Sequence, residues 1–413
     1  RTPEVRIFEV RPGFDRVAVD FHGSHATSRP AGQPEGPPGC RQGVSPLWLS
    51  NPMSTPAQTH EIEDSQVSKQ GASSANESTI GVRLRRRSLT VPGILLGLPC
   101  LLVLLTPVLL VGGLIDLVVR RRGSTVRISL YAVWLFAIES VGIVVAGLLW
   151  LRFAPSGQLR GRASLQAHSR LLGWWATNLV RGARTLLGMR HFLEGRSNLD
   201  AGGPLIVLAR HGRPAASLLV VAILAESGLR PRFVIARELL WDPCLDIVGH
   251  RIPNYFVDRD SFDNREELGN IARLATGLAN DEALVIFPEG TNFSRSRRDR
   301  AIEVLGRTAP EREASARRLT HVLPIRTSGL LSVLETDRSA DLLFLNHVGV
   351  EDFHKLRDLW RNVPFPTPLS FSASRTSRQE VPDVADKAAL VRWLDARWEE
   401  FDSWVTTNSS ASS

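Results

Sequence analysis

The sequence contains little lysine and cysteine, and both shortages limit the classes of protein to which it can belong. Only three of its 50 basic residues are lysines (Lys69, Lys355 and Lys387), and the formal net charge is +8. An arginine bias of this kind is typical of a GC-rich genome, so part of it has no functional meaning. The three cysteines are far apart and form neither a CxxC pair nor a disulfide framework, which favours a reducing compartment.

The chain also lacks internal repeats, metal-ligand spacing and the interleaved basic and aromatic residues of a nucleic-acid module. A basic chain can otherwise bind an acidic membrane surface or phosphorylated substrates. The arginines gather beside apolar runs and in loops after predicted strands. We therefore expect no nucleic-acid partner and no bound metal.

The N-terminal part of the chain consists of two stretches that differ in composition. Residues 1–82 are rich in Pro, Gly, Ser and Gln without an apolar period, which predicts a disordered region. Met53 is the first methionine and a candidate for the natural start. Residues 83–153 then hold two apolar runs, 89–119 and 128–151, each long enough for the roughly 20 residues of a membrane-spanning helix. This pattern predicts a membrane-embedded helical segment, interrupted only by Glu139 in the second run.

The topology of this segment stays open. Arginines precede the first run, lie between the runs and follow the second. A two-span hairpin would place both outer clusters and the rest of the chain in the cytoplasm, whereas a first run that dips into one leaflet would keep all three clusters inside. Prolines 92, 99 and 107 predict a kink or a re-entrant path. Residues 154–190 predict an amphipathic helical linker, either packed or, as we favour, on the membrane surface.

Residues 191–404 alternate short apolar runs with helical patterns, and this alternation predicts an α/β domain with a mainly parallel sheet flanked by helices. Residues 405–413 read as a flexible tail. We expect strands over 204–209, 232–236, 254–257, 283–287, 321–326 and 341–346, and helices over 217–226, 264–280, 300–318 and 386–404.

Polar segments follow three of these expected strands. His211 ends the first strand, Asp258 and Arg259 follow another, and "FPEGT" (287–291) follows a third. The carboxyl ends of parallel strands lie at one edge of a sheet, where ligands of α/β proteins bind. A strand that runs into Pro-Glu-Gly-Thr offers free backbone N–H groups, a hydroxyl and a carboxylate, which suits an anionic or hydroxyl-bearing substrate.

Together these segments resemble the 1-acylglycerol-3-phosphate acyltransferase (lysophospholipid acyltransferase) family, most closely its actinobacterial-type members. His211 matches the histidine of the His-x4-Asp motif, "YFVDR" the second block, "FPEGT" the third and "VLPI" (322–325) the fourth. The resemblance covers roughly residues 170–350 and includes "RELLWDPCLDIVGHRIPNYFVDR". It implies transfer of a fatty acyl group from acyl-CoA or acyl carrier protein to the hydroxyl of 1-acylglycerol-3-phosphate or a related lysophospholipid, in phospholipid biosynthesis.

The resemblance also implies roles for particular residues. His211 is the expected general base, and the motif aspartate would orient its ring. The expected substrate-binding residues are Arg213, Asp258, Arg259, Glu289, Gly290, Thr291, Asn292, Arg295 and Pro324. The expected partners are the lysophospholipid, the acyl thioester as co-substrate and membrane lipids, with no further cofactor. The expected location is the cell membrane, with the catalytic domain facing the cytoplasm.

Two residues depart from the family pattern. Ala216 stands where the His-x4-Asp motif has its aspartate, and Asn292 stands where the third block has arginine. Asp242 or Asp258 could supply the missing carboxylate, while Arg213, Arg295, Arg297 and Arg298 could supply the missing charge. The alternative function is a catalytically impaired relative that acts as a lipid-binding membrane protein.

Overall fold

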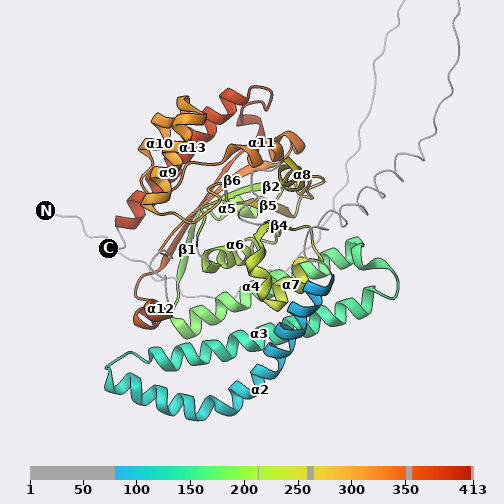
Figure 1. Cartoon of the computed structure of the whole chain (residues 1–413), viewed down its shortest axis with the longest axis vertical. Coiled ribbons are helices and arrows are strands. Elements are labelled where there is room, and N and C mark those ends of the chain that lie inside the picture. The colour runs from blue at the N-terminus through green and yellow to red at the C-terminus, as the bar shows by residue number, and fades with distance from the viewer. Residues whose placement is uncertain (1–79, 213, 258–264, 350–355, 411–413) are drawn as a thin grey trace, which may run out of the picture. The chain divides into compact units, whose positions relative to one another are not determined.

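The computed structural model describes residues 80–212, 214–257, 265–349 and 356–410. They form a seven-stranded sheet in the order β1-β7-β6-β2-β5-β3-β4. All neighbouring strands pair in parallel except β6 and β7, so the mainly parallel sheet flanked by helices is confirmed (Figure 1). The strands are β1 (His191–Glu194), β2 (Leu205–Ala209), β3 (Arg230–Ala236), β4 (Tyr255–Val257), β5 (Glu282–Ile286), β6 (Asp341–Val348) and β7 (Leu369–Thr376).

Helices cover both faces of the sheet, because the central strands are apolar on both sides. In β2, Leu205, Val207 and Ala209 pack into one core cluster, whereas Ile206 and Leu208 pack into the other. This alternation follows from the two-residue period of a strand. The helices of the α/β part are α5 (Ser197–Asp200), α6 (Pro214–Glu226), α7 (Pro243–Gly249), α8 (Arg265–Arg273), α9 (Arg295–Thr308), α10 (Glu313–Arg318), α11 (Thr327–Thr336), α12 (Leu356–Asn362) and α13 (Lys387–Ser410).

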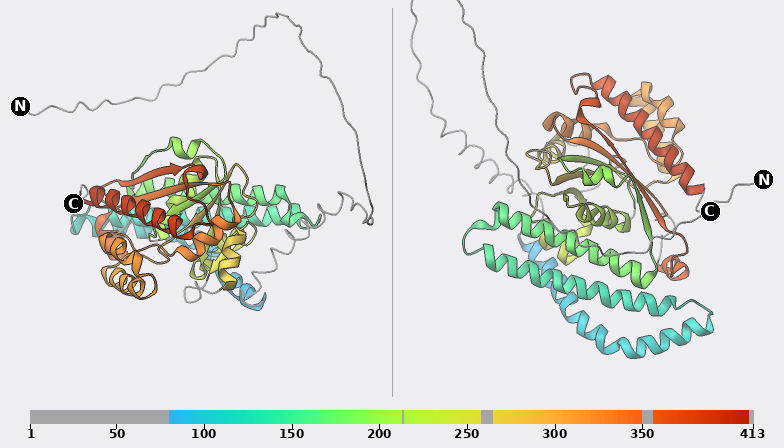
Figure 2. Two further views of the ribbon diagram at one scale, coloured as in Figure 1. Left: turned by 90° about the horizontal axis from the view of Figure 1, so that it is seen from above. Right: turned by 180° about the vertical axis from the view of Figure 1, so that it is seen from behind.

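Two further helices precede the sheet, α2 (Ile80–Val118) and α3 (Ser124–Phe153), and they run back along each other as a hairpin (Figures 1 and 2). By length and composition both could cross a membrane. None of the most apolar stretch of α2 is buried by protein, against a third of that of α3. Figure 1 shows α2 bent, and its three internal prolines each remove a helix hydrogen bond.

Helix α4 (Arg162–Leu187) lies between this hairpin and the sheet domain in both views (Figures 1 and 2). It buries Leu172, Ala176 and Val180, so of the two alternatives the structure shows the packed helix. Its Trp175 Nε1 donates to Glu139 Oε1 at 2.6 Å. The acidic residue that interrupts the second apolar run is therefore buried against α4.

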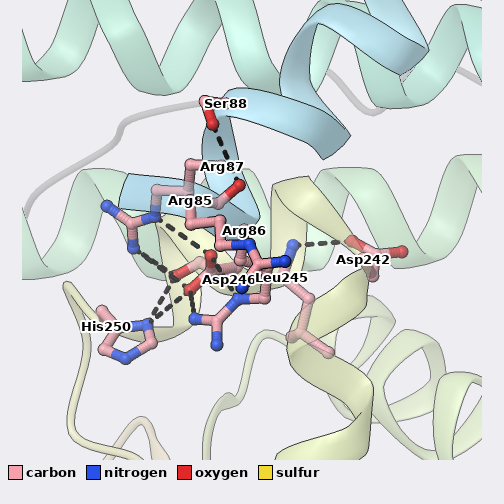
Figure 3. A network of polar contacts seen from close by, with 8 residues as sticks. All are labelled: Arg85, Arg86, Arg87, Ser88, Asp242, Leu245, Asp246 and His250. Carbon is pink, nitrogen blue, oxygen red and sulfur yellow. Dashed lines mark hydrogen bonds and ion pairs between the residues drawn. The ribbon is translucent and has the colours of Figure 1, made fainter. Parts of the chain in front are cut away.

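A charged joint fixes the start of α2 to α7, and we call Arg86, Arg87, Asp246 and His250 the α2–α7 joint (Figure 3). Arg86 donates to Asp246 Oδ2 at 3.1 Å and to Oδ1 at 2.8 Å. Arg87 donates to Oδ2 at 3.0 Å and to Oδ1 at 3.2 Å. His250 Nδ1 lies 3.1 Å from Oδ1, and the Asp246 side chain is completely buried.

Several expected boundaries were wrong. Residues 80–82 belong to α2 and residues 405–410 to α13, so neither stretch is disordered or a tail, while residues 1–79 and 411–413 lie outside the described residues. The expected helix over 300–318 is divided into α9, the 3-10 turn η4 (Pro310–Arg312) and α10, and the one over 264–280 ends at Arg273. Other 3-10 turns are η2 (Gln158–Arg160), η3 (Arg237–Trp241) and η5 (Arg378–Glu380).

The expected strand over 321–326 is also wrong, and hydrogen bonding explains why. The N–H groups of His321 and Val322 donate to Asp402, and the N–H of Leu323 donates to Glu289. These donors are satisfied by side chains and are not available to a neighbouring strand. The segment is an irregular connection between α10 and α11.

Candidate active site

The parallel strands β2 and β5 deliver two loops to one edge of the sheet. Their register pairs Leu208 with Ile286, so Arg210 and His211 emerge next to the segment 287–292. We call residues 210–211 and 287–292 the His211 edge. Strand β4 also ends here, but Asp258 and Arg259 lie outside the described residues, as does Arg213.

Glu289 connects the two loops and the fourth block. Its Oε1 accepts from His211 N at 2.8 Å, and its Oε2 accepts from Leu323 N at 2.8 Å. The residue is 2 % exposed. Burial raises the pKa of Glu289 to about 7, although both backbone hydrogen bonds favour the ionised form. Glu289 thus holds the backbone of both His211 and Leu323. Pro324, the residue after Leu323, is buried.

Asn292 holds the ring of His211. The Asn292 Oδ1 atom lies 2.7 Å from His211 Nδ1, and the Phe287 ring meets the imidazole edge-on with 5.5 Å between centroids. An amide oxygen accepts hydrogen bonds, so this contact places a hydrogen on Nδ1. The residue that replaces the third-block arginine therefore occupies the position of an orienting group.

Ala216 faces a different environment from the one expected. It lies in the first turns of α6, is 1 % exposed and packs against Gly212, where an added Cβ would come within 2.5 Å of the Ala216 methyl. Of the two candidate replacement carboxylates, Asp242 caps α7 by accepting from Leu245 N at 2.8 Å. Asp258 lies outside the described residues. Asn292 is the side chain that the structure places on His211 Nδ1.

A pocket opens beside His211. Gly290 and Arg326 line it together with apolar residues of the sheet and of α8 and α11: Val234, Ala236, Val257, Ile271, Ile286 and Leu330. Gly290 has φ +69°, and a Cβ there would lie 3.0 Å from Arg326 Nε, so glycine allows the guanidinium to approach. Sequence reasoning missed Arg326, although it directly follows the fourth block.

The remaining expected site residues lie near the pocket without lining it. Thr291 is partly exposed in the same loop, and Arg295 is exposed at the start of α9. Of the nearby arginines, Arg297 donates to the backbone oxygen of Asn292 at 3.1 Å. The arrangement combines the His211 imidazole, an apolar pocket and a guanidinium. Such a site can remove a proton from a hydroxyl next to an apolar, anionic substrate.

The chain is similar to known proteins in sequence and in structure. Residues 190–328 match the family model described as Acyltransferase. The chain is similar to lysocardiolipin acyltransferase 1 of Danio rerio, at 23% identity over 245 residues, which is 56% of this chain and 59% of that protein. Among solved structures it is similar to the 1-acyl-sn-glycerophosphate (LPA) acyltransferase PlsC of Thermotoga maritima, with a TM-score of 0.40, 16% identity, and 66% of this chain and 95% of that chain covered.

Proposed function

From the match of residues 190–328 to the acyltransferase family model, we propose that the protein transfers a fatty acyl group from an acyl thioester to the hydroxyl of a lysophospholipid. The observation that carries the proposal is the 2.7 Å contact between His211 Nδ1 and Asn292 Oδ1 beside the pocket. We propose His211 Nε2 as the base, at the edge where a substrate hydroxyl would enter. The acceptor class we propose is 1-acylglycerol-3-phosphate or a related lysophospholipid.

The reaction follows from this geometry. His211 Nε2 takes the proton of the acceptor hydroxyl while the hydroxyl oxygen attacks the thioester carbonyl. The new C–O bond forms, the C–S bond breaks, and the imidazolium returns its proton to the leaving thiolate. Asn292 Oδ1 keeps the ring in place through both proton transfers, and Arg326 offers a cation for the acceptor's phosphate. A positioned base of this kind contributes about 10²- to 10⁴-fold to the rate.

We further propose that the protein acts at the cell membrane with the His211 edge on the cytoplasmic side. The unburied apolar surface of α2 supports this placement, because in water it would be costly. The arginines in the first turns of α2 and those at and beyond the end of α3 lie at corresponding ends of the hairpin, which suits a cytoplasmic position for both.

The central experiment measures acyl transfer by the full chain in detergent micelles with oleoyl-CoA and lysophosphatidate. His211→Ala should lower the rate by about 10²-fold or more, because the base is lost. The control His191→Gln changes another half-buried histidine, in β1 at the far side of the sheet, and should keep the wild-type rate. Equal rates in wild type and His211→Ala would refute His211 as the base. Absent turnover in the wild type, with lipid binding retained, would favour the impaired lipid-binding relative.

A second series tests the orienting role of Asn292. Asn292→Leu removes the acceptor on Nδ1 and should cost about 10²-fold, as a misplaced catalytic group does. Asn292→Asp keeps an acceptor and should retain activity. Its carboxylate should also raise the pKa of His211, shifting the acid limb of the pH–rate profile to higher pH. A purely structural Asn292 would leave that limb in place. Ala216→Asp should give no gain, because the site is buried and Nδ1 is already bonded.

A further inference from the structure

The α2–α7 joint carries more positive than negative charge. Asp246 is the one carboxylate to which Arg86, Arg87 and His250 all bond (Figure 3). Two guanidinium groups therefore share a single negative charge. The charges do not balance even when His250 is neutral, so the joint keeps at least one unit of excess positive charge.

Arg251, which follows His250 in the chain, adds to this excess of positive charge. Its side chain is half-buried, and the structure gives it no hydrogen bond or ion pair with any residue in 80–212, 214–257, 265–349 or 356–410. Burial lowers the pKa of Arg251, and the neighbouring charges of Arg87 and Arg160 lower it further. Arg87 and Arg160 are thus near enough to act on Arg251 through their charges, and Arg251, which is partly desolvated, has no anion among the described residues.

A buried imidazole lies within reach of the same charge. His168 on α4 is 1 % exposed, and its Nδ1 lies 2.8 Å from the backbone oxygen of Ser164, so that nitrogen carries the hydrogen. Its Nε2 is buried and has no hydrogen-bond partner among the described residues. Burial lowers the pKa of His168, and the charge of Arg251 lowers it further. His168 therefore supplies no negative charge to Arg251.

The position of the cluster indicates what the missing anion is. Arg87 lies directly before the apolar run of α2, and Arg160 in η2 follows the apolar end of α3. The cations thus lie where both apolar helices change to charged sequence. A ligand that combines a phosphate with acyl chains could bond to the guanidinium groups and pack on the apolar helices at once. A free anion would gain only the first interaction.

We propose that Arg251, together with Arg87 and Arg160, binds the headgroup phosphate of an anionic diacyl lipid. The proposal rests on the membrane placement proposed above and not on acyl transfer. Guanidinium groups suit phosphate because their N–H groups match two phosphate oxygens. A basic cluster next to a membrane helix gains further from the negative surface potential of anionic lipid.

The test is thermal unfolding of the full chain in neutral detergent with added dioctanoyl phosphatidylglycerol, dioctanoyl phosphatidylcholine or inorganic phosphate. A ligand at 100 times its Kd shifts the unfolding equilibrium about 100-fold towards the folded state. We expect phosphatidylglycerol to raise Tm, and the other two additives to raise it much less. The increase should persist in Arg326→Gln, which removes the cation that lines the pocket at the His211 edge, so that lipid bound there is excluded as its source.

Variants locate the site. Arg251→Gln should abolish the Tm increase caused by phosphatidylglycerol, and Arg251→Lys should keep part of it, because lysine retains the charge without the fork. Arg160→Gln changes an exposed residue, so it should weaken the increase without disturbing the fold. Arg307→Gln on α9 removes an equally charged, exposed arginine and should change nothing.

Three results would overturn the proposal. One is an unchanged phosphatidylglycerol response in both Arg251→Gln and Arg160→Gln. Another is an equal response to phosphatidylcholine, which would indicate apolar packing alone. The third is an equal response to inorganic phosphate, which would mean that the site takes a free anion and not a lipid. Failure of acyl transfer would leave these Tm measurements unaffected, so the two proposals can fail separately.

Discussion

Glu289 at the His211 edge and Asp246 in the α2–α7 joint are both buried carboxylates, but their partners differ in charge. Glu289 accepts from two neutral backbone N–H groups, and burial raises its pKa to about 7. Burial would also raise the pKa of Asp246, but hydrogen bonds from His250, Arg87 and Arg86 outweigh it, and the pKa falls below the usual range. Asp246 thus stabilises the joint through ion pairs, whereas Glu289 is a buried carboxylate that holds the loop carrying His211 at some cost in stability.

The strongest test of this contrast exchanges the carboxyl of Glu289 for an amide. Glu289→Gln can accept only one of the two N–H bonds, because its NH₂ group would face a second donor. We expect the acyl-transfer rate to fall by about 10²-fold, since the His211 loop shifts. The control Glu303→Gln alters an exposed carboxylate and should be silent. Wild-type activity in Glu289→Gln would show that His211 needs no such support.

The matching change at the joint should affect stability instead of rate. Asp246→Asn leaves Arg86 and Arg87 without their shared charge, and breaking a buried ion pair costs about 3–5 kcal/mol. We expect a lower unfolding free energy in denaturant titrations, with acyl transfer per folded molecule within about threefold of wild type. A large loss of rate in folded Asp246→Asn would mean that the joint and the His211 edge are coupled.

The smallest expected effect is a difference in pH dependence. The raised pKa of Glu289 means that the folded state binds a proton more tightly than the unfolded state. Its contribution to the free energy of unfolding therefore falls as the pH rises from about 4.3 towards 7. Asp246, with a lowered pKa, contributes stability above pH about 3.9 that is lost on acidification.

These two contributions can be separated by comparing each variant with wild type in thermal unfolding between pH 4.5 and 7.5. Glu289→Gln should remove the part of the decline that this residue causes, so that its deficit relative to wild type shrinks as the pH rises. Asp246→Asn should show a nearly constant deficit over this range. Parallel curves for wild type and Glu289→Gln would contradict the raised pKa.

The sequence predicted much of the fold and which loops meet at the His211 edge. His211, Glu289 and Gly290 follow apolar runs that are recognisable as strands, so the pattern alone placed them at one edge. It could not show that Asn292 contacts a ring 81 positions away, because that contact depends on side-chain directions from two loops. Sequence alone does not give side-chain directions. The pattern therefore indicates only that Asn292 replaces an arginine and that Ala216 replaces the aspartate expected to orient the imidazole.

Other misses have local causes. Strand β1 has only four residues, and β7 alternates apolar with Ser, Arg and Thr, so neither shows the continuous apolar run of a buried parallel strand. The fourth block reads as a strand because it is apolar, yet its N–H groups bond to Asp402 and Glu289. Arg326 lies in no recognised motif, and only the fold brings it to Gly290.

The length of chain between the two sides of the α2–α7 joint has a consequence for biosynthesis. Arg86 and Asp246 are 160 positions apart, so a ribosome adding about 5–20 residues per second makes Asp246 roughly 8–32 s after Arg86. Once synthesis passes Phe153 the hairpin is complete, and until Asp246 is made its arginines lack their carboxylate. We therefore expect α2 and α3 to enter the bilayer first, and the arrival of α7 to dock the newly made domain onto a hairpin already in place.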